Sequence, residues 1–384
     1  MSLPIVVIGG GLSGLYAAHL LEQAGQRVLL IEARERLGGR ILSRGHADDR
    51  HRLDLGPSWF WPAMNPLVAG LVSTLGLDAF AQHTQGAAAI EGPDGQVHRQ
   101  QVTWQQSPAS YRIAGGMQRL IEGLQTRLEG KVHILTGTRV ASLKLRPHAV
   151  ELDLQDAFGA WTQQAAQVVL TIPPRLTAQD LQMEPTWPPQ LVQQMRDTPS
   201  WMAGQAKFVA VYPRAFWREA GWSGTAMSHR GPLAEIHDAS DASGETAALF
   251  GFVGATPAYR TGIGIGIGIG QDAVTRQALA QLQRIFGEQA GSPLWTAVQD
   301  WAEEPLTAAA SDRQPLARHP LYDAGTVPQA WAQRLWLAGT ERSANAGGYL
   351  EGALESAALA VQELLAQRSR TPGTNASEHE RTLP

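Results

Sequence analysis

Buried strands and a helix alternate at the start of the chain. Ile5–Ile8 is an unbroken apolar run closed by glycines, which is typical of a strand buried on both faces. Residues Leu12–Ala24 carry apolar side chains at helical spacing, and Gly25 is expected to end this helix. Arg27–Ile31 is a second apolar strand. A strand, a helix and a strand in this order predict a right-handed parallel unit and a doubly wound sheet.

Beyond this unit, short apolar runs with partial alternation predict further strands. We expect an antiparallel meander over Val132–Leu135, Arg139–Leu145 and Ala149–Leu154. Other buried strands are expected at Val168–Ile172, Ala206–Tyr212, Ala247–Val253 and Leu335–Ala338. Helices are expected at Asp272–Phe286 and Glu351–Gln367.

Composition narrows the function classes. The 384 residues suffice for two modest domains, and a net charge of −4 without a basic run gives no attraction for nucleic acid. No stretch approaches the roughly 20 apolar residues of a membrane helix, and the first residues lack the features of a signal peptide. The sequence holds no cysteine, which excludes disulfides and thiolate chemistry and fits a reducing cytoplasm. Its 11 histidines show no ligand spacing, so no metal is expected.

Three glycines connect the first strand to the first helix. Gly9, Gly11 and Gly14 form a Gly-x-Gly-x-x-Gly loop, with Ser13 inside it. Such a loop permits a tight turn, a close approach of pyrophosphate and tight packing of the helix, whose N-terminus then faces the phosphates. Glu32 ends the second strand, where its carboxylate can accept both ribose hydroxyls and would repel a 2′-phosphate. The alternative is a structural glycine turn with a surface glutamate.

The residues after the second strand carry a family resemblance. Glu32-Ala33-Arg34 followed by Gly38-Gly39-Arg40 resembles the Glu-Ala-Arg-x-x-x-Gly-Gly-Arg segment of the flavin-containing amine oxidase family, which includes monoamine and polyamine oxidases. The resemblance implies that the dinucleotide is FAD and that Arg34 and Arg40 lie along it. The alternative reading of these arginines is an exposed basic turn.

The resemblance extends over most of the chain. Leu53–Trp59 resembles the segment that passes the flavin ring, Gly115–Leu120 the start of a helix that re-enters the nucleotide domain, and Val169–Pro174 a strand ending in two prolines. Leu337–Glu341 and Gly347–Ala353 resemble the closing signature, whose helix N-terminus would stabilise negative charge on the flavin. Further cofactor-binding residues implied in this way are Gly56, Pro57, Ser58, Val140, Trp301, Gly339, Glu341, Gly348, Tyr349, Leu350 and Ala353.

Two residues are candidates for catalysis. Lys207 resembles the family lysine that holds a water near flavin N5, with the solvent face of an edge strand as the alternative. Tyr349 corresponds to an aromatic residue that flanks the substrate amine, with core packing as the alternative. Trp59, Phe60 and Trp61 are expected either to line the substrate pocket or to pack in a core or interface.

The sequence also departs from the monoamine oxidase pattern. The positions of the flavin-linking cysteine and of the second aromatic beside the amine fall at Ala310 and Ser311. The cysteine link is therefore absent, the aromatic pair is incomplete, and we expect non-covalent FAD. A histidine link stays open, and the resemblance does not make this chain a monoamine oxidase.

The resemblance implies an FAD-dependent oxidoreductase that oxidises the C–N bond of a small amine. A hydride equivalent would pass from the amine carbon to flavin N5, with oxygen as the expected acceptor. Two alternatives are a desaturase-like or protoporphyrinogen-oxidase-like enzyme acting on C–C bonds, and a non-catalytic binding protein on the same fold. The sequence does not name the substrate or the oligomeric state.

We expect an α/β fold with a discontinuous, Rossmann-like FAD domain, containing the parallel sheet and the meander, and a smaller α+β substrate domain. The FAD domain is predicted to comprise residues 1–58, 113–198 and 299–369, and the substrate domain residues 59–112 and 199–298. Residues 370–384 are polar and expected to be disordered. Gly262–Gly270 has glycine at every second position, so it cannot hold a second phosphate loop and is interpreted as a flexible surface connection.

Overall fold

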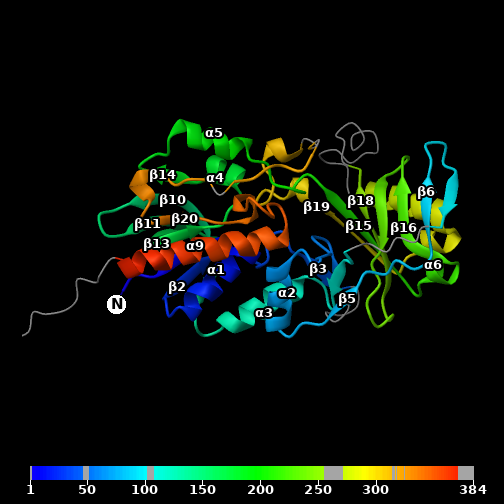
Figure 1. The fold of residues 1–384 in the computed structure, drawn as a ribbon. Coiled ribbons are helices and arrows are strands. Elements are labelled where there is room, and N and C mark those ends of the chain that lie inside the picture. The colour runs from blue at the N-terminus through cyan, green and yellow to red at the C-terminus, as the bar shows by residue number, and fades with distance from the viewer. Residues whose placement is uncertain are drawn as a thin grey trace, which may run out of the picture.

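A computed structural model describes residues 2–45, 52–101, 108–254, 271–313, 316, 318–323 and 325–370. Two sheet-based parts lie side by side, and the chain crosses between them several times (Figure 1). Gly262–Gly270 and the predicted tail beyond residue 370 lie outside the described residues. Across the described helices, none combines the length and apolarity needed to cross a membrane. The cytoplasmic location stays a prediction.

The first part is built on a five-stranded parallel sheet. Its order is β20 (Leu335–Leu337), β13 (Gln167–Leu170), β1 (Ile5–Ile8), β2 (Val28–Ile31) and β9 (His133–Leu135). This order confirms the predicted doubly wound sheet. One assignment was wrong, because Val132–Leu135 was expected in the meander and its strand instead pairs with β2. A three-residue strand carries too little alternation to reveal which sheet it joins.

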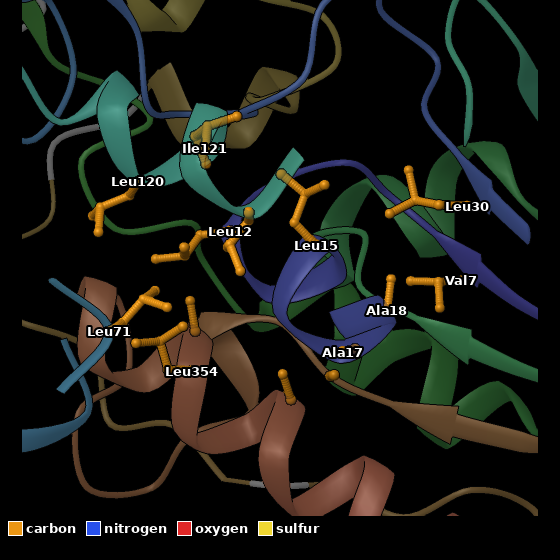
Figure 2. Packing of buried hydrophobic residues seen from close by; sticks show 14 of the residues in the cluster. Val7, Leu12, Leu15, Ala17, Ala18, Leu30, Leu71, Leu120, Ile121 and Leu354 are labelled. Atoms are coloured by element: carbon orange, nitrogen blue, oxygen red, sulfur yellow. The ribbon is translucent and has the colours of Figure 1, made fainter. Parts of the chain in front are cut away.

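Helices cover one face of this sheet. Alternation along β1 turns Val7 toward this face, where Figure 2 shows it beside Ala18 of α1 (Leu12–Gln23). The same core includes residues of α3 (Gln118–Leu128), α2 (Pro66–Thr74) and α9 (Leu350–Arg370), and Figure 2 shows Leu71 of α2 next to Leu354 of α9. Gly25 follows α1 with a φ of 70°, which suits the residue after a helix end. The buried face of α2 belongs to this core, although residues 59–112 were assigned to the substrate domain. The predicted domain boundaries stay a prediction, and we propose that α2 belongs to the nucleotide domain.

The other face of the parallel sheet packs against the meander. Its strands lie in the order β12 (Ala160–Ala165), β11 (Val150–Gln155), β10 (Arg139–Leu145) and β14 (Gln182–Glu184). Val6 and Ile8 of β1 contact this second core together with the meander residues Leu143 and Leu152. The helices α4 (Pro174–Asp180) and α5 (Pro189–Asp197) close it.

The second part is a seven-stranded mixed sheet. The order is β19 (Trp295–Asp300), β15 (Ala206–Tyr212), β18 (Ala247–Val253), β17 (Leu233–Asp238), β16 (Trp222–Ser228), β6 (Ala87–Glu91) and β7 (Val97–Gln100). Alternation along β15 turns Phe208 and Ala210 toward α8 (Gln271–Phe286), and Val209 and Val211 toward Leu55 of the nucleotide part. Because β15 lies between β18 and β19, the edge-strand alternative for Lys207 is wrong.

Short elements join the two parts. Two small sheets pair β3 (Ser43–Gly45) with β4 (Arg52–Asp54) and β5 (Ala79–Ala81) with β8 (Tyr111–Ile113). Short helical turns in the described part of the chain are α6 (Phe216–Glu219), η1 (Glu288–Gly291), η2 (Trp301–Glu303), η3 (Ala310–Arg313), η4 (Gln329–Trp331) and η5 (Thr340–Arg342). These connections bring segments distant in sequence to the junction where the site lies.

Candidate active site

A cavity of about 840 Å³ lies at this junction. Ile8 and Ile31, at the carboxyl ends of β1 and β2, and Thr171 after β13 line one side, while Lys207 and Phe252 of the seven-stranded sheet line another. The strand order reverses at β1, since β2 follows on one side and β13 lies on the other. Crevices at such switch points are the usual ligand sites of open α/β sheets.

The structure brings nearly all the predicted site residues to this cavity. Those that line it are Gly9, Gly11, Ser13, Glu32, Ala33, Arg34, Gly39, Arg40, Gly56, Pro57, Ser58, Trp59, Trp61, Val140, Lys207, Trp301, Gly339, Gly348, Tyr349, Leu350 and Ala353. Three predicted residues do not line the cavity: Gly14, Phe60 and Glu341.

The three glycines of the first loop differ in how much space surrounds them. A Cβ on Gly9 would lie 2.4 Å from Thr171 Oγ1, and one on Gly14 would lie 1.8 Å from the carbonyl oxygen of Gly9. Gly14 is thus required for packing and does not itself face the cavity. A Cβ on Gly11 would meet nothing within 4 Å. The helix α1 begins there without a side-chain cap, so its first N–H groups are left for a ligand.

Glu32 is fixed at the end of β2. Its buried carboxylate accepts hydrogen bonds from the backbone N–H of Gly10 at 2.6 Å and of Arg34 at 2.8 Å. The Arg34 guanidinium donates to Thr307 Oγ1 at 2.7 Å, so it is not an exposed basic turn. Val140 of β10 lines the same end of the cavity. The arrangement suits a ribose between an acidic side chain and an apolar strand.

The Gly38-Gly39-Arg40 segment packs against the first loop. A Cβ on Gly39 would lie 3.3 Å from the Cα of Gly11. Arg40 donates two hydrogen bonds to Glu341, at 2.6 and 3.1 Å. Glu341 was predicted to bind the cofactor, but it does not line the cavity; it is buried and paired with the Arg40 guanidinium, which does.

The second glycine loop reaches the cavity from the C-terminal part of the chain. A Cβ on Gly348, whose φ is 83°, would lie 2.7 Å from the Cβ of Trp201. Tyr349 is 47% exposed and lines the cavity, so the core-packing alternative is wrong. Glu351, in the first turn of α9, accepts the N–H groups of Leu67 and Val68 at the start of α2. The negative charge of Glu351 therefore interacts with the N-terminus of α2.

Lys207 is the buried cation of the site. Its Nζ donates to Ser58 Oγ at 2.6 Å and to the Gly56 carbonyl at 3.0 Å, and it lies 4.1 Å from the centre of the Phe250 ring. Burial lowers the pKa of Lys207 to about 7; Arg112 also lowers it, whereas Asp54 raises it. Both protonation forms of Lys207 are then populated near neutral pH.

The aromatic run Trp59–Trp61 divides between two roles. Trp59 and Trp61 line the cavity, as predicted. Phe60 points the other way: it is 2% exposed, packs in the core beneath α2 and pairs through its backbone with Tyr111. Alternation explains the correction, since adjacent residues of an extended segment face opposite sides. Trp301 lines the cavity and donates from Nε1 to the Leu55 carbonyl at 2.9 Å.

Sequence reasoning missed several cavity residues, of which Glu235 matters most. It lies on β17, lines the cavity, and accepts a 3.4 Å contact from His237 Nε2. This contact lowers the pKa of the Glu235 carboxyl, although burial opposes it. Trp201, Gln205 and Phe252 were also missed. In the sequence, Glu235 is an acidic residue within the strand Leu233–Asp238. Its residue type alone does not indicate whether the side chain faces a cavity or solvent.

The two positions that depart from the monoamine oxidase pattern lie outside the cavity. Ala310 and Ser311 are exposed on η3 and do not line the cavity. The aromatic neighbours of Tyr349 are instead His319, stacked on it at 5.1 Å, and Trp201, which packs against His319 at 4.6 Å. Among the described residues, no group of acidic and histidine side chains could hold a metal ion.

The cavity fits a dinucleotide flavin. Both glycine loops border the same space, at Gly9–Ser13 and at Gly348–Ala353, although they are more than 300 residues apart in sequence. Uncapped helix N–H groups at Gly11 and a buried carboxylate at Glu32 match the pyrophosphate and the ribose. The same cavity is also lined by Trp301, Lys207 and Tyr349.

Comparisons with known proteins agree with this geometry. Residues 99–365 match the family described as flavin containing amine oxidoreductase, and residues 7–75 match the NAD(P)-binding Rossmann-like domain. A probable flavin-containing monoamine oxidase A of Dictyostelium discoideum is 23% identical over 94% of this chain and 97% of its own length. Putrescine oxidase of Kocuria rosea is 34% identical over 42% of this chain and 31% of its own length.

Solved structures share the fold. Cyclohexylamine oxidase of Brevibacterium oxydans superposes with a TM-score of 0.76 at 18% identity, covering 96% of this chain and 100% of that one. Wild-type putrescine oxidase bound to putrescine superposes with a TM-score of 0.75 at 18% identity, covering 95% and 99%.

Proposed function

Because the chain belongs to the flavin containing amine oxidoreductases and is therefore an FAD-dependent amine oxidase, we propose that its substrate is a short amine bearing a second positive charge. The observation that carries this proposal is the Glu235 carboxylate in the cavity wall. Among the described residues, its side-chain contact is with His237, and it forms no ion pair with a lysine or arginine. A substrate ammonium can therefore occupy its free side.

Strand pairing gives the geometry of this anchor. Phe252 of β18 is paired with Lys207 of β15 on one side and with Glu235 of β17 on the other. Lys207 and Glu235 are thus two strands apart, about 10 Å between backbones. Between them lies Phe252, and the Trp59 ring packs against it at 6.4 Å. A short carbon chain with an amine at each end suits one acidic end and an apolar middle.

Each part of the chain would serve the cofactor in a defined way. Glu32 would accept the ribose hydroxyls, the N–H groups after Gly11 would bind the pyrophosphate, and the start of α9 would stabilise negative charge on the ring. When bound, FAD accepts two electrons and the hydrogen leaving the amine carbon, with oxygen as the proposed final acceptor. Lys207 would hold or accept a proton beside the ring, and Tyr349 and Trp201 would orient the reacting amine.

We further propose that FAD is held without a covalent bond. The sequence has no cysteine, and no histidine lines the cavity in the described part of the chain. Precipitation of the purified protein with acid tests this, because it should release the yellow colour completely into the supernatant.

Glu235→Gln is expected to raise KM for a four-carbon diamine by about 10- to 100-fold. Removing a charge-assisted hydrogen bond costs roughly 1.5–3 kcal/mol, and about 1.4 kcal/mol is a factor of ten. KM for the monoamine of equal carbon number should change by less than about twofold, because that substrate leaves Glu235 unused. Steady-state oxygen consumption with both substrates measures the difference.

Glu363→Gln, at an exposed position on α9, is the matched control and should change neither KM. Equal losses for both substrates would argue against a counter-ion role. A monoamine oxidised better than any diamine would instead favour a cyclic or aromatic amine, for which the tryptophans of the wall would be the recognition surface. If neither the diamine nor the monoamine bleached the bound FAD anaerobically, the proposed substrate class would be wrong.

A further inference from the structure

One histidine contacts two aromatic side chains of the cavity wall without lining the cavity itself. His319, between η3 and η4 in the sequence, stacks on the Tyr349 ring with centroids 5.1 Å apart and planes 3° from parallel. It also packs against Trp201 at 4.6 Å. Tyr349 and Trp201 line the cavity, whereas His319 does not. We propose that His319 is a positioning residue that holds the Tyr349 ring in the orientation in which it meets the reacting amine. This inference rests on the proposed place of Tyr349 beside the amine and is independent of the charge that Glu235 recognises.

The backbone of Tyr349 is fixed, but its side chain depends on this stacking contact. Thr340 Oγ1 donates to the Tyr349 carbonyl at 2.7 Å, and the Tyr349 N–H donates to the Ala346 carbonyl at 3.2 Å. The side chain is half exposed, and its hydroxyl has no hydrogen-bond partner in the described part of the chain. A tyrosine in that position has several staggered conformers, and ordering it costs conformational entropy. The parallel imidazole selects one of these conformers.

His319 is itself held by two further rings. Trp201 meets it at an angle of 57°, and Tyr322 contacts it edge-on at 5.9 Å and 87°. Tyr322 is buried, and its hydroxyl donates to the Pro199 carbonyl at 2.8 Å. The Nε2 of His319 is buried and makes no hydrogen bond among the described residues, so packing holds the imidazole at this nitrogen. The ring that stacks on Tyr349 therefore has a fixed position of its own.

A fixed Tyr349 ring matters because the amine carbon must be aligned with the atom that accepts its hydrogen. A misplacement of about 1 Å can cost a factor of about a hundred in rate. The position of a second aromatic residue beside the amine is taken by Ser311, which is exposed and lies outside the cavity. Support for Tyr349 comes instead from His319, on the ring face that the imidazole covers. A stacked aromatic pair stabilises one arrangement by a factor of about 2 to 10.

The test is the rate at which an amine reduces the bound FAD of the holoenzyme in the absence of oxygen. The amine is whichever of a panel of monoamines and diamines bleaches the parent protein fastest, so the readout does not depend on Glu235. His319→Leu should lower the rate constant at saturating amine by about 3- to 10-fold and leave the affinity for FAD unchanged. His148→Leu, at an exposed turn, is the matched control and should change neither quantity.

A double-mutant cycle separates positioning from damage to the fold. If His319 acts through Tyr349, His319→Leu should have no further effect on the rate constant in a Tyr349→Leu background. His319→Phe keeps a flat ring against Tyr349 and should retain most of the parent rate. If His319→Leu does not hold FAD, His319→Ala takes its place in the cycle.

Equal losses from His319→Leu with and without the Tyr349 ring would overturn the proposal, as would a parent-like rate in His319→Leu itself. An additive cycle together with a diamine KM that responds to Glu235→Gln would refute the role of His319 and leave the counter-ion role of Glu235 standing. A coupled cycle with an unresponsive KM would refute only the counter-ion role.

Discussion

A Gly11→Asp variant is expected to fold normally and to lose FAD. Gly11 has a φ of −74° and a ψ of −178°, which any residue adopts, and a Cβ there would meet nothing within 4 Å. Aspartate is a favourable residue at the start of a helix, so the free energy of unfolding should not fall. Its carboxylate would lie where the pyrophosphate is expected, and a like charge about 4 Å away costs roughly 4 kcal/mol. FAD affinity should fall about a thousandfold.

Fluorescence quenching of FAD titrated with the FAD-depleted protein measures this affinity. Gly11→Asn is the matched control, since it adds the same bulk and the same helix cap without the charge, and it should weaken FAD binding less. Gly14→Ala gives the contrasting result, because its Cβ would lie 1.8 Å from a backbone oxygen. That variant should lose stability as well as FAD. Normal FAD binding by Gly11→Asp would refute the assignment of this loop to the pyrophosphate.

Replacing Lys207 by methionine is expected to stabilise the FAD-depleted protein most at low pH. The pKa of Lys207 falls from 10.5 to about 7 on folding, mainly through burial. Between these values the unfolded chain binds more protons, so the free energy of unfolding of the parent rises with pH across this window and is lowest below pH 7. At about 1.4 kcal/mol per pKa unit, the full cost below pH 7 is roughly 5 kcal/mol.

Urea unfolding at pH 6 and pH 9 measures this difference. The stability advantage of Lys207→Met over the parent should shrink by roughly 3 kcal/mol between these two values, because part of the cost is relieved at pH 9. Lys131→Met is the matched control, since the Lys131 side chain is 55% exposed and its substitution should give a difference that is flat in pH. A flat difference for Lys207→Met would mean that Lys207 keeps an ordinary pKa in the fold.

Local patterns predicted residues that the structure brings to one cavity. Gly9, Gly11, Glu32 and Gly39 could be placed because turn geometry, helix starts and strand ends require specific residue types at fixed spacing. The position of Phe60 was predicted wrongly, because three adjacent aromatic residues do not indicate which side of the chain each one faces. The assignment of Val132–Leu135 was also wrong, because a three-residue strand could not be assigned to its sheet.

The substrate half depended on contacts that no local pattern encodes. In the sequence, Glu235 is one acidic residue of a strand. The pairing of β17 with β18 and of β18 with β15 places it two strands from Lys207. Glu341 was read as a cofactor ligand, and only its contact with Arg40, 301 residues away in sequence, revealed that it holds an arginine.

The sequence by itself therefore determined the parallel nucleotide-binding unit, the two glycine loops, the absence of a cysteine link and the lysine on an apolar strand. These follow from short-range stereochemistry and residue type, which act within a few residues of each position. The tertiary structure decided which carboxylate lines the cavity, how deeply Lys207 is buried and which aromatic ring stacks on Tyr349. Those depend on how two sheets face each other across a cavity, because burial and Coulomb interaction are set by distance in space and not along the chain.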